Sequence, residues 1–130
     1  RARVEPQMQL VDIGEGPLDE RIDNFVAHRL AVFAVLAPIT RAARRTANSL
    51  DLSSEEFGAF QMVLRQQFLD QFEPEFSTLA GRVLTRAVVA AEIGFQFDSL
   101  EYLFTSFEGN TDKMGHLLGR QLRIHLEVLR

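Results

Sequence analysis

The feature of this sequence that most restricts its fold is a series of aromatic residues at helical spacing. Between residues 57 and 76, apolar side chains recur at steps of three or four positions: Phe57, Phe60, Leu64, Phe68, Phe72 and Phe76. This spacing places all of them on one stripe of a single α-helix. Such a stripe either packs into the core against other helices or lines a pocket, and the sequence leaves both interpretations open.

Composition indicates one globular domain whose chemistry is recognition. A chain of 130 residues with 46% hydrophobic and 25% charged residues can bury a core without a disulfide, and it contains no cysteine, which fits a cytoplasmic location. The net charge of −4 gives no positive field for binding a nucleic-acid backbone. The longest apolar stretch, residues 30–39, has about ten residues where a membrane span needs roughly 20, so we expect no contact with a membrane.

Apolar periodicity predicts an all-α fold of about six helices and no strand. Residues 1–16 are expected to form the end of a preceding element and a connector, and residues 17–130 to form one helical domain. The first helix begins at Leu18, and Pro38 is expected to end or kink it. A separate basic segment, residues 40–48, should follow. Its three arginines, at positions 41, 44 and 45, would form a solvated face or contact another domain.

Capping signals predict where the later helices begin and end. Ser53 and Glu56 form a capping box ahead of the phenylalanine stripe, and that helix should run to about Glu73, where Pro74 bends or stops it. A fourth, alanine-rich helix then covers residues 79–95. Asp98 is expected to cap a short fifth helix that ends at Gly109, and Thr111 to cap the last one.

The order of these elements resembles the C-terminal regulatory domain of TetR-type (tetracycline-repressor-like) bacterial transcription regulators. The resemblance runs from about residue 17 to residue 129, and its stretches are LDERIDNFV at 18–26, LAPITRAA at 36–43, LRQQF at 64–68 with Phe72 and Phe76 after it, FDSLEYL at 97–103 and GNTD at 109–112. It implies a domain that binds a small effector and dimerises. DNA would be bound only through an N-terminal helix-turn-helix domain that this chain does not contain.

A pocket is expected between the helices that begin near residues 18, 54 and 77, where it would take a small, largely apolar effector. The candidate ligand-binding residues are Phe25, Arg29, Phe33, Phe60, Met62, Leu64, Phe68 and Phe72. Arg29 would orient a carboxylate or carbonyl through two parallel hydrogen bonds, with Gln61, Gln67 and Gln71 as neutral partners. The alternative is that the rings are ordinary core and Arg29 lies at a solvated helix edge.

The fourth and last helices are expected to form a four-helix-bundle interface of a homodimer, because apolar residues cover too much of the last helix for one contact. The candidate interface residues are Leu84, Val88, Ala91, Phe95, Met114, Leu118, Leu122, His125 and Leu129. A purely intramolecular core is the alternative.

No motif for catalysis, metal binding or a cofactor is present. The three histidines, His28, His116 and His125, are far apart in sequence, and no serine is paired with a histidine and an acid by spacing. We therefore expect no metal, no cofactor and no enzymatic activity. Two rival functions stay open: a helical carrier or enzyme for an apolar small molecule in the same cavity, and a structural interaction module with no ligand and a fully packed stripe.

Overall fold

The computed structural model describes residues 10, 12–45 and 54–129, and for residues 54–57 it gives the helical backbone alone. The described residues form α1 (Leu18–Arg45), α2 (Ser54–Gln71), α3 (Glu73–Phe76), α4 (Gly81–Glu92), the 3-10 helix η2 (Ile93–Phe95), α5 (Phe97–Ser106) and α6 (Thr111–Glu127). These ranges contain six α-helices and no strand, so the predicted all-α fold class is confirmed.

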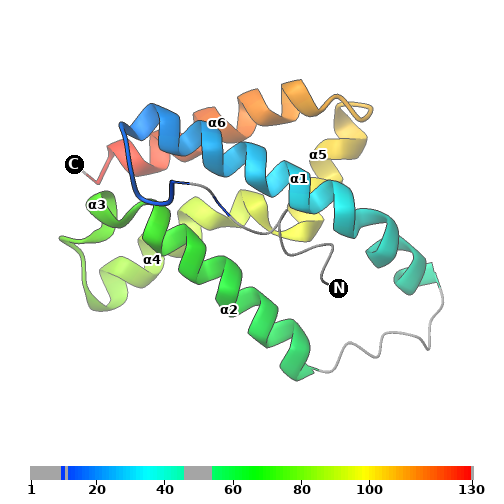
Figure 1. Cartoon of the computed structure of the whole chain (residues 1–130), viewed down its shortest axis with the longest axis horizontal. Coiled ribbons are helices and arrows are strands. Elements are labelled where there is room, and N and C mark those ends of the chain that lie inside the picture. The colour runs from blue at the N-terminus through cyan, green and yellow to red at the C-terminus, as the bar shows by residue number, and fades with distance from the viewer. Residues whose placement is uncertain (1–9, 11, 46–53, 130) are drawn as a thin grey trace.

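Helices α1 and α6 lie side by side and run in opposite directions, α4 packs against α6, and α2 lies below α1 in this view with its C-terminal end near the start of α1 (Figure 1). Two glycines of α6 face α1. A methyl group added at Gly115 would lie 3.6 Å from Leu30 and 3.7 Å from Val26, and one at Gly119 would lie 3.8 Å from Ile22. These are ordinary van der Waals distances, so the two helix surfaces already fit together closely.

Helix α1 continues through Pro38 to Arg45, so the expectation that it ends at Pro38 before a separate basic segment is wrong. Pro38 is exposed, which lets the helix carry the proline ring on its solvent side, and the turn beyond it is fastened to α5. Arg41 donates two hydrogen bonds to the Glu101 carboxylate, at 2.7 and 2.6 Å, and its guanidinium lies 5.1 Å from the centre of the Phe104 ring. Tertiary contacts thus offset the backbone hydrogen bond that proline removes.

The expected helix caps are corrected in two places. Asp98 does not cap α5: the cap position is Gln96, which makes no side-chain capping bond, and Asp98 instead pairs with Arg44 at 2.7 Å. Asn110 rather than Thr111 caps α6, because its side-chain oxygen accepts a hydrogen bond from the Lys113 backbone nitrogen at 3.1 Å. The Ser53–Glu56 capping box lies outside the described side chains.

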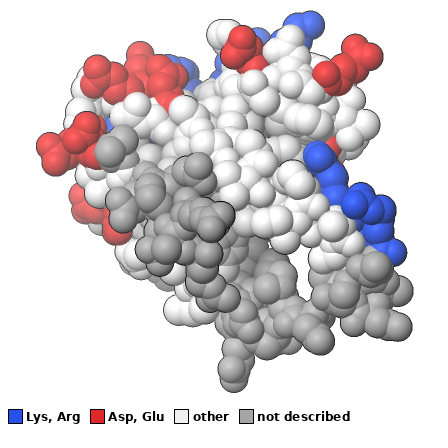
Figure 2. Space-filling model, turned by 45° about the vertical axis from the view of Figure 1, so that its right-hand side comes forward, with Lys and Arg blue, Asp and Glu red and all other residues white. Residues whose placement is uncertain are grey.

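Two of the three α1 arginines bind acidic residues of α5, and Arg44 and Arg45 are exposed, so this end of α1 is a solvated face that also carries ion pairs. The hydrogen bond from Arg41 lowers the pKa of Glu101 and raises that of Arg41. Figure 2 shows basic side chains gathered at one edge of the molecule, beside the grey atoms, while the largest acidic group lies on the opposite side. The surface between them carries little charge.

Helix α2 ends at Gln71, two residues before the predicted end near Glu73. Pro74 lies in the first turn of the next short helix, α3. Proline suits the first turn of a helix, where its missing N–H would have no partner in any case. Helix α3 accordingly starts at Glu73 and has proline in its first turn. The helix after it begins at Gly81, two residues later than predicted, and its last turn tightens into η2.

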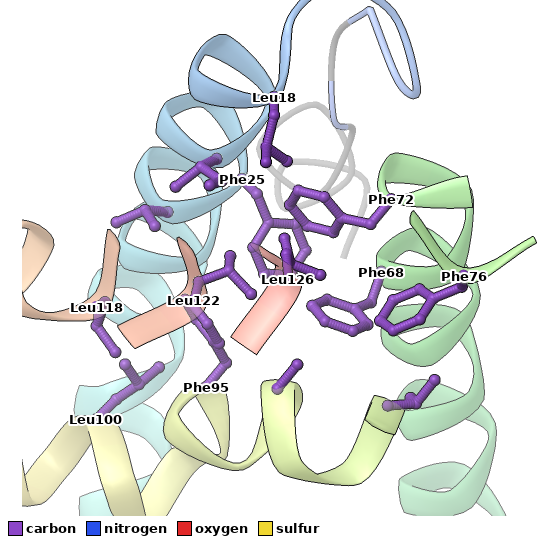
Figure 3. Packing of buried hydrophobic residues seen from close by; sticks show 14 of the residues in the cluster. Leu18, Phe25, Phe68, Phe72, Phe76, Phe95, Leu100, Leu118, Leu122 and Leu126 are labelled. Atoms are coloured by element: carbon purple, nitrogen blue, oxygen red, sulfur yellow. The ribbon is translucent and has the colours of Figure 1, made fainter. Parts of the chain in front are cut away.

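The centre of the core is a group of phenylalanine rings around Phe25 of α1 (Figure 3). Phe25 meets Phe68, Phe72 and Phe95 edge to face, at centroid distances of 5.3, 5.5 and 5.1 Å. Phe25, Phe68 and Phe72 are completely buried, and Phe76 packs against Phe68 at 5.6 Å. The C-terminal half of the phenylalanine stripe is thus core.

A buried polar network joins the segment before α1 to the end of α2. Arg21 forms a two-bond ion pair with Glu75, at 2.6 and 2.9 Å, and also donates to the backbone oxygens of Gly16 and Gln71. The Gln71 side chain accepts a hydrogen bond from the Gly14 backbone nitrogen at 2.8 Å and donates to the Arg21 carbonyl at 2.9 Å. The described part of the predicted connector is therefore held against the helical domain.

Helix α1 has the length and apolar composition that a membrane-spanning helix needs. One 18-residue window of α1 has a mean hydropathy of 1.4, which the count of contiguous apolar residues had not revealed, and 44% of that window is buried inside the structure. By length and composition alone α1 could cross a membrane, but the core helix of a folded domain gives the same signal.

Replacing two glycines by alanine should change stability in opposite directions. Gly58 lies inside α2 with nothing within 4 Å of an added methyl group, so Gly58→Ala should raise the free energy of unfolding by about 0.5–1 kcal/mol through helix propensity. Gly14 has a φ of +78°, and an added methyl group would lie 2.9 Å from the Asp70 carbonyl oxygen. Gly14→Ala should lower stability by more than about 1 kcal/mol. Urea unfolding followed by circular dichroism measures both, and equal effects would contradict the description of these sites.

The Arg21–Glu75 pair should give a strongly non-additive mutant cycle. Arg21→Met or Glu75→Leu alone leaves one charge buried without its partner and should cost about 3–5 kcal/mol, while the double variant should lie within about 2 kcal/mol of the original chain. Unfolding free energies of the four proteins test this. Additive losses would show that the two charges are not coupled.

Candidate functional site

The eight residues predicted to bind a ligand do not surround one cavity. Phe25, Phe33, Phe68 and Phe72 are buried, and the first, third and fourth contact each other in the core. Arg29 is also buried. Phe60 and Leu64 are partly buried, whereas the Met62 side chain is 73% exposed on the outer side of α2.

The Arg29 guanidinium is bound by protein groups. Its Nη1 donates to the Gln67 side-chain oxygen at 2.8 Å and lies 2.9 Å from Nδ1 of His28, and its Nη2 donates to the Leu64 carbonyl at 2.9 Å. The guanidinium also stacks 4.3 Å from the centre of the Phe25 ring. Burial lowers the pKa of Arg29 to about 10, and the nearby charge of Glu92 opposes this shift. Arg29 therefore stays charged at neutral pH, but its side chain is buried.

A crevice of about 410 Å³ lies between α2 and the α4–η2 segment. Gln61, Met62 and Arg65 form one wall, and Val89, Glu92, Ile93 and Gln96 form the other. The Arg65 Nε donates to Oε1 of Glu92 at 2.8 Å, and its Nη2 forms an ion pair with the same oxygen at 2.7 Å. Glu92 is 7% exposed and lies between two cations, Arg65 in the crevice and Arg29 behind it.

A second, more apolar groove of about 530 Å³ runs between the α4–η2 segment, α5 and α6. Its exposed members include Ile93 and Tyr102, at 61% and 72% exposure. Five of the predicted dimer-interface residues contribute to its lining: Ala91, Phe95, Leu118, Leu122 and His125.

Most of the predicted interface residues are nevertheless buried within the chain itself. Val88, Ala91, Met114, Leu118 and Leu122 are each 4% exposed or less, because the inner stripe of α6 packs against α1 and α4 of the same chain. Leu84, His125 and Leu129 are partly buried. Much of what the sequence pattern marked as interface is therefore intramolecular core.

Sequence reasoning missed the residues that shape the two hollows. Ile93 opens η2 and Tyr102 lies in the middle of α5, and periodicity gave neither any special weight. Arg65 and Glu92 are charged residues 27 positions apart, and no sequence motif connects them. Only the width of the apolar face of α6, which includes exposed Ile124 and Val128, signalled that apolar surface would be left over.

Within the part of the chain that the structure describes, no group of three or more His, Cys, Asp or Glu side chains could hold a metal ion. The described residues instead leave two hollows that have one lining residue in common, because Ile93 lines both the crevice and the groove.

Comparisons with protein-family models, with curated proteins and with solved structures give no match for this chain. The resemblance to TetR-type regulators thus stays a prediction from the sequence.

Proposed function

We propose that this chain is the effector-sensing and dimerisation domain of a TetR-like transcription regulator in the cytoplasm. A second copy of the chain covers the groove between α4, η2, α5 and α6, and a small effector enters the crevice between α2 and α4. The observation that carries the proposal is the shared position of Ile93, which lines both hollows. An occupant of one hollow therefore touches a residue that shapes the other.

Exposed apolar residues support the groove as a homodimer surface. Ile93 and Tyr102, which line the groove, are 61% and 72% exposed, and Ile124 and Val128, which do not line it, leave further apolar surface at the C-terminal end of α6. Apolar surface of this kind marks an interaction site, and a two-fold axis lets the same patch serve both copies. We take the occupant to be a second copy of the chain. The resemblance assigns the fourth and last helices, α4 and α6, to dimerisation, and the exposed residues lie on these helices or next to them, on η2 and α5.

Helix α2 supplies a route from the crevice to the N-terminal segment. Its middle carries Met62 and Arg65, and its last residue, Gln71, holds the Gly14 backbone. In the proposed parent protein a DNA-binding domain precedes this segment. An effector that shifts α2 would change the relative populations of two dimer arrangements and so the spacing of the DNA-binding domains.

The packed rings favour one rival function, an interaction module that binds no small molecule. Phe68, Phe72 and Phe76 fill the core and line neither the crevice nor the groove. An interaction module of this kind would still dimerise but would bind no effector. A test of ligand binding at the crevice therefore distinguishes it from the effector-sensing domain.

An acidic substitution in the groove should dissociate the dimer. Sedimentation equilibrium of the chain at micromolar concentration should show a dimer, and Tyr102→Asp should weaken it at least about tenfold because a charge would be buried at the interface. Ala31→Asp is the matched control, since Ala31 is exposed on α1 and lines neither hollow. A monomeric original chain would refute the interface. Leu122 and Val88 are unsuitable positions because they are core residues whose substitution would unfold the chain.

A further inference from the structure

We propose that the crevice between α2 and α4 binds a small amphipathic carboxylate, with Arg65 receiving the carboxylate and Met62, Val89 and Ile93 covering the apolar part. This inference rests on the proposed function, because it names the class of effector for the crevice.

Charge is the first argument for an anion. Among the lining residues Arg65 is the cation and Glu92 the carboxylate, and buried Arg29 behind them also acts on Glu92. One carboxylate is thus shared by two guanidinium groups, which leaves one positive charge in excess. A positive excess in a partly enclosed site attracts a monoanion and disfavours an amine.

Hydrogen-bonding capacity is the second argument. Arg65 donates its Nε–H to one oxygen of Glu92, its Nη2 lies 2.7 Å from that same oxygen, and among the described residues its Nη1 has no partner. The Arg65 side chain is 44% exposed, so these remaining N–H groups can be reached from the crevice. A guanidinium suits a carboxylate because its donors form a planar fork, and the amides of Gln61 and Gln96 add further donors.

Exposed apolar side chains are the third argument. Met62, Ile93 and Val89 are 73%, 61% and 45% exposed beside this charged pair. A flexible methionine adapts to an alkyl chain, and about 410 Å³ falls in the usual range for small-ligand sites. Apolar walls beside one excess positive charge match a molecule with a carboxylate at one end and an alkyl or aryl group at the other.

The test uses three eight-carbon probes that differ only in the head group: octanoate, octan-1-ol and octylamine. Isothermal titration of the 130-residue chain should show octanoate binding at least about tenfold more tightly than the other two. Arg65→Gln should weaken octanoate at least about tenfold, and Arg86→Gln, an exposed α4 arginine that lines neither hollow, should leave it unchanged. If Arg65→Gln unfolds, Arg65→Lys is the replacement test. It keeps the charge but loses the planar fork, so it should weaken octanoate binding by less than about tenfold.

Methionine methyl labelling locates the binding. The chain has three methionines, and the Met62 methyl signal should shift on saturation with octanoate while that of fully buried Met114 stays in place. Tighter binding of octylamine or octan-1-ol would overturn the carboxylate assignment while leaving an effector crevice. Failure of all three probes to move the Met62 signal would overturn the inference, and the dimer measured by sedimentation would stand or fall separately.

Discussion

The structure depends on the edge-to-face contacts of one ring, Phe25. This ring touches Phe68 of α2, Phe72 between α2 and α3, and Phe95 of η2, so it joins three segments that are far apart in sequence. Burying a phenylalanine contributes about 2–3 kcal/mol, and each edge-to-face pair adds roughly 0.5–1.5 kcal/mol. Because Phe25 is held by three rings and by the Arg29 guanidinium stacked over it, the direction of α2 relative to α1 is fixed. That direction puts Met62 and Arg65 of α2 at the surface, opposite α4.

Ion pairs fix the two ends of α1 in different ways. At its start, Arg21 and Glu75 are both buried, so the pair adds little net stability but disfavours arrangements that separate the charges. At its end, Arg41 and Glu101 are partly exposed, and stacking of Arg41 on Phe104 supplements the ion pair. Helix α1 can therefore carry an internal proline and still stay continuous.

Local sequence signals predicted the fold class and most helix ranges, and they failed where tertiary contacts outweighed them. Pro38 disfavours a helix locally, but the contacts of Arg41 with α5 lie 60 residues away in sequence and were invisible to any local pattern. Asp98 looked like a cap because capping aspartates are common, yet a partner on α1 took its carboxylate. The phenylalanine stripe was recognised, but spacing cannot distinguish a ring that meets Phe25 from one that faces a cavity. The crevice was missed for the same reason, since Arg65 and Glu92 meet only after α2 and α4 are packed.

The packed stripe moves the search for a sensing site from the rings to the α4–η2 segment. Short 3-10 segments in helical chains often mark hinges. Here the Ile93 carbonyl accepts a hydrogen bond from the Ser99 hydroxyl of α5 at 2.8 Å, so η2 and the start of α5 are joined. A ligand that displaces Ile93 from the crevice side would therefore also move α5, which carries Tyr102 into the groove. Coupling between the two hollows then needs no rearrangement of the phenylalanine core, because the moving parts all lie outside it.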